Sequence, residues 1–422
     1  MRRAQHVLAC LAVVIAPARS WAADADLSAS LLKLEGVIAY ARQHNPEISA
    51  ARARWRAAQA RPAQAGALPD PMLDLAYHNE SFDRLRLGES DFAWLRLGAS
   101  QEVPFPGKLG LKRDIASHEA EQAGENFRRV ELGVISRVKT AFAEYAHLDV
   151  QLDILRRNKV LLDQFARTAE AKYAVGQGIQ QDVLKAQVEE SLLIERETTL
   201  DQRRQSQTAE INALVNRSAT APLGAAEHSM ESTLTPTLEA LTGAAAAHSP
   251  ELKAAERRVA GDESAVALAR REYLPDFVVR ADYMHKAALL PEWEVGLVVK
   301  IPLYFATKQR SAVQEAAASL SEARSMREDA DHGIQSRIRD LYARAKASER
   351  LIALYRTAVL PQARLALESA TAAYQVNKVD FLTLLNAFTV TLEYEMRYHE
   401  ELASFQKAAA ELEAVVGEPL EG

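Results

Sequence analysis

Histidine and cysteine are the residues of this chain that most readily bind metals or act as nucleophiles. The ten histidines are scattered, and no two lie at the spacing that places metal ligands on one helix face. His147 and His399 are therefore expected on packed or solvated helix faces, and His78 alone does not make a metal site. No Ser/His/Asp grouping, phosphate-binding loop or paired-carboxylate arrangement stands out. The sequence predicts no catalytic residue, no metal site and no cofactor, and hence no enzyme.

Two short polar segments share one order of residues. Tyr173 and Gly176 form a Tyr-x-x-Gly pattern, and Tyr374 and Asn377 form a Tyr-x-x-Asn pattern. Gly and Asn both tolerate a left-handed backbone, so each pattern predicts a tight turn between helices. Further polar or small residues follow these turns: Gly178, Asp182, Asp380, Thr383 and Asn386. A carboxylate in the first turn of a helix, such as that of Asp182, interacts favourably with the helix dipole.

The helices that position these turns are unusually long. No proline interrupts residues 112–172, and apolar residues recur there at steps of three and four, as in Val134, Val138 and Phe142. A helix over that range would be ~90 Å long, whereas globular helices average ~11–12 residues. Similar patterns cover 309–373 and 380–416. The fold class is therefore mainly α.

Between the helices lie segments with a two-residue period. In 276–284 and in 292–301, one face is apolar and the other carries charges. The segments 72–80 and 92–103 alternate in the same way. Segments of ~10 residues with this two-residue alternation are typical of transmembrane β-strands. A half-buried soluble hairpin also alternates, so the pattern alone leaves both possibilities open.

An internal duplication organises the chain. His44-Asn45-Pro46-Glu47 recurs as His248-Ser249-Pro250-Glu251, and Leu68-Pro69-Asp70 recurs as Leu274-Pro275-Asp276. Each half therefore has the order helix, two strands, long helix, turn, helix. The predicted parts are a cleaved signal peptide at 1–22, a first repeat at 23–218 with a helical hairpin at 111–216, an equatorial linker at 219–241, and a second repeat at 242–422 with a helical hairpin at 309–416.

The N-terminus has the features of a secretory signal. Arg2 and Arg3 precede a short apolar run that is below the ~20 residues of a membrane helix, and small residues follow it. Cys10 lies inside this segment; the alternative, a lipidated cysteine, has too few residues before it for an ordinary apolar run. The formal net charge of −6 and the interleaved charges do not suggest a nucleic-acid binder.

A secreted chain without a transmembrane helix can cross a membrane only with strands. Four strands are too few to close, since the smallest barrels have ~8. If the strands span a membrane, several copies must share one barrel, and three copies would supply ~12 strands.

The whole mature sequence resembles the TolC-type outer-membrane efflux channels. The residues that carry the resemblance are His44-Asn45-Pro46-Glu47, Leu68-Pro69-Asp70-Pro71, Gln101 to Leu109, Tyr173-x-x-Gly176 and Asp182-Val183-Leu184. The resemblance implies a homotrimer with a shared 12-strand β-barrel in outer-membrane lipid and a long periplasmic α-barrel. It also implies a passive duct that docks onto a periplasmic membrane-fusion adaptor and an inner-membrane resistance-nodulation-division pump.

The resemblance also suggests a cargo and a gate. The stretch Pro104 to Leu109 is similar to members paired with heavy-metal pumps, so metal cations are the expected cargo and drug-like organics the alternative. Asp182 and Tyr374 match an inter-hairpin gating contact at the periplasmic tip. Thr383 and Asn386 stand where members often carry acids, which puts a carboxylate ring at the tip in doubt. A periplasmic coiled-coil adaptor without a barrel remains a rival.

Overall fold

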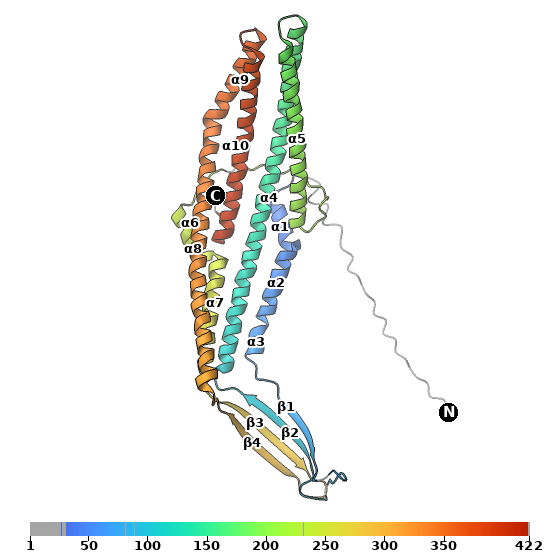
Figure 1. Ribbon diagram of the computed structural model, residues 1–422, viewed down its shortest axis with the longest axis vertical. Helices are drawn as coiled ribbons and strands as arrows, with labels where there is room; N and C mark the ends of the chain where they lie inside the picture. Colours follow the sequence, from blue (N-terminus) through green and yellow to red (C-terminus); the bar gives the residue numbers. More distant parts are fainter. Residues whose placement is uncertain (1–26, 28–30, 81, 88, 231, 421–422) are drawn as a thin grey trace, which may run out of the picture.

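The computed structural model describes residue 27 and residues 31–80, 82–87, 89–230 and 232–420. The predicted signal peptide at 1–22, including Cys10, lies outside these residues. The molecule is elongated, with two helical hairpins at one end and a four-stranded sheet at the other (Figure 1). Among the described helices, none is both long enough and apolar enough to span a membrane.

Each half of the chain contributes the same elements in the same order. The first half contains α1 (Leu34–His44), α2 (Pro46–Gln59), α3 (Arg61–Ala65), β1 (Met72–His78), β2 (Trp94–Val103), α4 (Lys108–Ala174) and α5 (Gln180–Leu214). The second half contains α6 (Leu238–His248), α7 (Pro250–Arg271), β3 (Asp276–His285), β4 (Glu292–Lys300), α8 (Arg310–Leu354), α9 (Leu360–Gln375) and α10 (Phe381–Val416).

The repeated Asn-Pro-Glu and Ser-Pro-Glu landmarks are helix starts. The Asn45 side chain caps α2 by accepting hydrogen bonds from the backbone N–H groups of Glu47 and Ile48, at 2.8 and 3.1 Å. Its amide also donates to the carbonyl of Leu214 at the end of α5, at 2.8 Å. Proline follows as the first helical residue, where its missing N–H costs nothing. The cap therefore both starts α2 and anchors the far end of the first hairpin.

The linker between the halves spans 215–237, because α5 ends at Leu214, and is therefore shifted from the predicted 219–241. Helix α6 already begins at Leu238, because Thr237 accepts a hydrogen bond from the Ala240 N–H at 3.2 Å and so caps it. One bound of each strand also differs by one or two residues from the predicted 72–80, 92–103, 276–284 and 292–301. The observed bounds are the end of β1 at His78, the start of β2 at Trp94, the end of β3 at His285 and the end of β4 at Lys300. Alternation continues into turn residues, so it does not mark where backbone pairing stops.

The second hairpin is not one uninterrupted helix pair, although its pattern predicted one over 309–416. Two π-helical segments, η2 (Phe305–Gln309) and η3 (Tyr355–Val359), precede α8 and α9. Pro361 lies two residues after the end of η3, and its ring and missing N–H prevent a regular α-helical ladder there. In the first half, α4 runs without interruption for 67 residues. The spacing of apolar residues in the sequence does not reveal the one-residue insertions that make these π-helical segments.

The sheet is antiparallel in the order β1-β2-β3-β4. Each half supplies one pair of neighbouring strands, and β2 joins β3 across the halves over the register Leu95↔His285 to Val103↔Phe277. Strands β1 and β4 are the outer strands of this sheet. Within the described residues of one chain, one edge of each therefore has no neighbouring strand.

Three hydrophobic clusters hold the helical part together. One joins the two hairpins through residues such as Leu162, Phe165 and Phe388. The other two lie beside the linker, one in each half. Phe165 of α4 and Phe388 of α10 meet edge to face at 5.9 Å between ring centroids. Helix α4 contributes to the first two clusters and connects the sheet to the hairpin tips (Figure 1).

The corner between the sheet and α4 depends on a buried lysine. Lys108 is 2% exposed, and its Nζ lies 2.9 Å from Asp276 Oδ1 and 3.2 Å from Glu272 Oε2. It also donates to the carbonyl of Leu274 at 3.0 Å. Asp276 in turn accepts from the Phe105 N–H at 2.7 Å. The start of α4 in the first half is thus bound to the segment before β3 in the second half.

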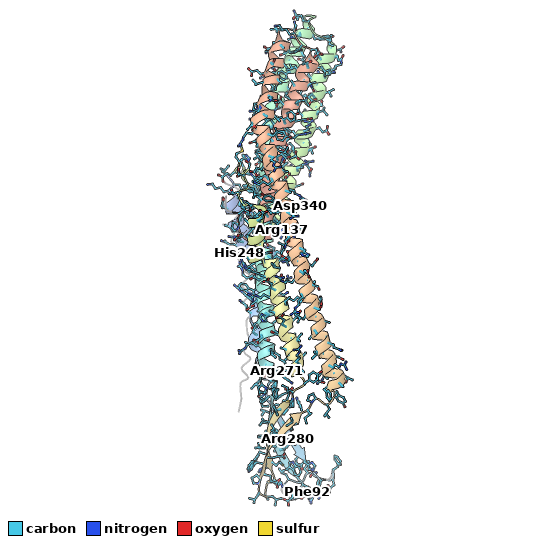
Figure 2. The ribbon with its side chains drawn as sticks, turned by 90° about the vertical axis from the view of Figure 1, so that its left-hand side faces the viewer. Phe92, Arg137, His248, Arg271, Arg280 and Asp340 are labelled. Atoms are coloured by element: carbon cyan, nitrogen blue, oxygen red, sulfur yellow. The ribbon has the colours of Figure 1, made fainter. Side chains whose placement is uncertain are left out.

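Gly107 makes this corner possible. Its φ is 91°, in the left-handed region, and a Cβ there would lie 1.9 Å from Nη1 of Arg271. That Arg271 nitrogen donates to the carbonyl of Pro106 at 2.6 Å. Figure 2 shows Arg271 at the foot of the helices, next to the sheet. Residues 104–109 therefore serve the junction of sheet and helix.

Replacing Lys108 should loosen this corner. Lys108→Met keeps most of the side-chain volume but leaves Asp276 and Glu272 without their buried partner, at a cost of about 3 kcal/mol. The temperature at which the purified protein loses its folded form on semi-native gels should fall. Lys112→Met, at an exposed position one helical turn further along α4, is the matched control. Equal unfolding temperatures for the two variants would contradict the role given to Lys108.

Candidate functional site

The two hairpin turns have the same backbone construction. In the first, Gly176 has φ 76° and the Gln177 N–H donates to the Lys172 carbonyl at 2.8 Å. In the second, Asn377 has φ 60° and the Lys378 N–H donates to the Ala373 carbonyl at 2.9 Å. Both turns are therefore closed by a residue in the left-handed region. They form the tips at the end of the molecule opposite the sheet (Figure 1).

A lysine that the sequence patterns did not single out ties the two tips together. Lys172, in the last turn of α4, donates to the backbone carbonyl of Tyr374 and to Asn377 Oδ1, the latter at 2.5 Å. Its Nζ also lies 4.2 Å from the centroid of the Tyr374 ring, a cation–π distance. The matching position in the second turn is Ala373, as the hydrogen bonds of the two turns show. The bridge therefore runs one way, from the first hairpin to the second.

The structure brings Asp182, Tyr374 and Asp380 into one electrostatic neighbourhood. Burial raises the pKa of Tyr374, and the negative charge of Asp182 raises it further. Burial likewise raises the pKa of Asp182, with a further increase from the charge of Asp380. Within the described residues, no hydrogen bond joins the Tyr374 hydroxyl to Asp182. The two groups thus influence each other in one chain without being bonded.

Asp380 has a separate local task. Its carboxylate accepts the Thr383 N–H at 2.8 Å and so caps α10. Hydrogen bonding to Thr383, first with its side chain and then with its backbone N–H, is the main cause of the lowered pKa of Asp380. Thr383 and Asn386 are both exposed on the first turns of α10. The exposed surface of this turn therefore carries neutral polar groups at the two positions considered for acids.

The remaining predicted tip residues differ in their surroundings. Tyr173 is 49% exposed, whereas Tyr374 is 5% exposed and packs edge to face against Phe381 at 5.6 Å. Gly178 approaches the backbone closely, since a Cβ there would lie 3.1 Å from the Tyr173 nitrogen. The duplicated tyrosines are thus not equivalent: one lies on the surface, and the other lies in the hairpin core.

At the opposite end, one face of the sheet is apolar and open to its surroundings. Leu73, Leu75, Trp293 and Val295 are between 65% and 80% exposed. The strand register places them on the same face as Leu97 and Tyr283. A contiguous apolar face of this kind marks a contact with lipid or protein.

Comparison with known proteins identifies the fold and the family. A family model described as outer membrane efflux protein matches residues 37–216 and 241–418. The chain belongs to this family. The two matched ranges coincide with the two halves of the duplication. No curated protein matches the chain.

Solved structures share the fold of this outer membrane efflux protein at low sequence identity. The outer-membrane channel OprN is 18% identical with a TM-score of 0.74, over 91% of this chain and 89% of that one. CusC, whose structures concern folding and transmembrane channel formation, is 14% identical with a TM-score of 0.80, over 91% and 92%. The outer membrane protein VceC of Vibrio cholerae is 20% identical with a TM-score of 0.77, over 92% and 97%.

These findings confirm the predicted resemblance, the mainly helical fold with a membrane sheet, and the outer-membrane location. They also confirm that the protein is a passive channel component and not an enzyme. The rival interpretation, a periplasmic adaptor without a membrane sheet, is wrong.

The histidines group more closely than the sequence suggested. His147 of α4, His399 of α10 and His228 of the linker line a cavity of about 100 Å³ where the two halves meet. Burial lowers the pKa of His147 to about 4 and also lowers that of His399, so both are neutral at pH 7. Within the described residues, no group of three or more His, Cys, Asp or Glu side chains is arranged to hold a metal ion.

Removing the Lys172 bridge should release the second turn. Lys172→Met deletes both hydrogen bonds to the turn at 374–377, and charge-assisted bonds are worth about 1.5–3 kcal/mol each. Hydrogen–deuterium exchange of the amides at 374–380 should therefore become at least about tenfold faster. Lys378→Met, on the same turn and exposed, is the control. Identical exchange in the two variants would show that Lys172 does not hold the tip.

Proposed function

We propose that three copies of this chain form a passive exit duct in the outer membrane, served by a periplasmic adaptor and an inner-membrane resistance-nodulation-division pump. The observation that carries the proposal is the sheet, in which β1 and β4 each have one edge without a neighbouring strand while the apolar face is exposed. Unpaired backbone groups in lipid cost several kcal/mol each. Pairing β1 of one copy with β4 of the next removes both edges and gives a closed barrel of about 12 strands from three copies.

The long hairpins extend this barrel into the periplasm. Helices α4, α5, α9 and α10 carry exposed apolar side chains beyond the clusters that they bury within one chain, including Val160, Val188 and Leu365 at 60–65% exposure. Neighbouring copies in the proposed trimer supply partners for such side chains. The duct is passive because the pump supplies the energy.

The hairpin tips are the proposed gate. The family resemblance assigns Asp182 and Tyr374 to a contact that holds neighbouring hairpins closed. The structure supports this in two ways: the two groups lie close enough for the Asp182 charge to raise the Tyr374 pKa, and Lys172 bridges the hairpins at the same turn. A docking partner can break contacts of this strength, because each is worth only about 1.5–3 kcal/mol.

Conductance measures this gate directly. Asp182→Ala and Tyr374→Phe each remove one side of the contact, so the open fraction of single channels in planar bilayers should rise by about tenfold or more. Tyr173→Phe, at the exposed equivalent position of the first turn, is the control and should leave the conductance unchanged. An unchanged open fraction in both gate variants would contradict the proposed contact between Asp182 and Tyr374.

Heavy-metal cations are the proposed cargo, with drug-like organic molecules as the alternative. The support is the resemblance of Pro104 to Leu109 to members paired with heavy-metal pumps. In this structure, Gly107 and Lys108 of the stretch hold the sheet–helix corner, so the support for the cargo is the resemblance alone.

Deletion of the gene should lower the concentration of transition-metal cations that the host tolerates, because the exit step of their export is lost. Supplying the unaltered gene in trans should restore growth. Growth of the deletion strain in graded metal salts and in graded organic antimicrobials separates the two cargo classes. If the deletion strain is sensitive to the organic compounds alone, the result would contradict the metal cargo and support the drug-like organic molecules.

A further inference from the structure

The four strands place all of their charged side chains on one face. The register puts Leu73, Leu75, Leu97, Tyr283 and Trp293 on one side, and no Asp, Glu, Lys or Arg of the strands shares that side. The opposite side carries the charges of the strands: Asp74, Arg96, Glu102, Asp276, Arg280, Asp282, Glu292, Glu294 and Lys300. Acids outnumber bases on it. If the apolar face meets lipid, the charged face lines the interior of the closed barrel.

Three of these acids lie in one row across the sheet. Asp74 pairs with Gly98, Gly98 pairs with Asp282, and Asp282 pairs with Glu294. The row therefore crosses all four strands at one position of their register. In the proposed trimer it repeats three times and becomes a ring of carboxylates around the lumen.

Two arginines connect this row into a ladder. Arg96 Nη2 lies 2.9 Å from Asp74 Oδ2, and Arg96 Nε lies 3.8 Å from Asp282 Oδ1. Arg280 Nε lies 2.9 Å from Asp282 Oδ2, and Arg280 Nη2 lies 4.0 Å from Glu294 Oε1. Figure 2 shows Arg280 within the sheet. The central acid thus faces two guanidinium groups, and each outer acid faces one.

Two glycines make room for the ladder. A Cβ at Gly98 would lie 2.5 Å from Asp282 Oδ1, and one at Gly296 would lie 3.2 Å from Cγ of Arg280. Asp282 lies flat over Gly98 and is only 8% exposed. Because larger side chains would displace these charged groups, the ladder is a packed feature of this sheet.

The charges are not balanced along the row. Asp282 is covered and neutralised by two arginines, whereas the Asp74 and Glu294 side chains are 47% and 54% exposed. The ladder begins and ends in an acid, so one row holds three carboxylates against two guanidinium groups. Closure of the barrel brings β4 of one copy beside β1 of the next, and the exposed acids of both copies then flank each seam.

We propose that this row is a cation-selecting ring inside the membrane part of the duct, with Asp74 and Glu294 as the residues that set the selectivity. The inference rests on the proposed trimeric duct and deepens it. A ring of one net sign along a low-dielectric wall concentrates counter-ions and repels ions of its own sign. It places charge selection in the sheet, while Thr383 and Asn386 leave the exposed first turns of α10 neutral at the tip.

Reversal potentials in planar bilayers test the ring. With the full-length protein under a KCl gradient, the unsubstituted channel should favour potassium over chloride. In the double variant Asp74→Asn/Glu294→Gln, the ratio of potassium to chloride permeability should fall about fivefold, which is the effect of one unit charge at ~4 Å in water. Raising the salt well above ~0.1 M should reduce the difference, because the screening length there is only ~10 Å.

Two comparisons make the outcome decisive. Asp380→Asn removes an exposed acid at the tip and so reports how much of the ratio is set there, and the double variant in the sheet should lose the larger share. An unchanged ratio in the double variant, with a loss in Asp380→Asn, overturns the proposal. No conductance from the unsubstituted protein would overturn the duct itself, and the inference with it.

A thiol variant tests the ring within one folded assembly. Glu294→Cys channels should regain cation preference after reaction with an anionic methanethiosulfonate and lose more of it after reaction with a cationic one. Because the same inserted channels are measured before and after reaction, a folding defect cannot produce opposite shifts. Equal responses to the two reagents would show that position 294 does not face the conducted ions.

Discussion

Backbone hydrogen bonding at the two edges of the sheet is the constraint on which this molecule depends. Among the described strands, β1 and β4 each have a neighbour on one side only, and the proposed duct places the exposed apolar face beside them in lipid. Lipid offers no partner for unpaired N–H and C=O groups. In the proposed duct, further copies therefore complete the sheet, and the polar face turns inward.

The duplication fits this constraint, but the two halves divide the work unequally. Each half supplies one strand pair and one helical hairpin. The first half supplies Lys108, which binds the segment before β3, and Lys172, which binds the second turn. The second half accepts both contacts and contains the two π-helical segments. The first half thus serves as the continuous frame, and the second half is attached to it at both ends.

The parts of the fold that follow a short period could be predicted from the sequence, and those that depend on distant partners could not. Alternation located the strands, and apolar spacing located the long helices, because both report which face of one element is buried. Lys172 escaped notice because Tyr374 is 202 residues away and nothing near Lys172 marks it. The ladder was equally hidden, since Asp74 and Asp282 share a row only through the register of β1 with β2 and of β2 with β3.

The candidate site shows the same division. Gly176 and Asn377 were predictable as turn residues because their own backbone conformations require such residues. The burial of Tyr374 against Phe381 and the exposure of Tyr173 were not, although the two tyrosines occupy equivalent places in the repeat. Residues of like sequence context differ here because only one of them faces the other hairpin.

Cross-linking of the two edge strands tests most directly whether copies share one sheet. A single cysteine in β1, at Leu75→Cys, is combined in turn with Trp293→Cys, Val295→Cys and Leu297→Cys in β4, and the membranes are oxidised. A shared barrel predicts that at least one pair joins chains into covalent dimers and trimers on non-reducing gels, because β1 and β4 of one chain are separated by β2 and β3. Monomers alone at every pairing would contradict the account.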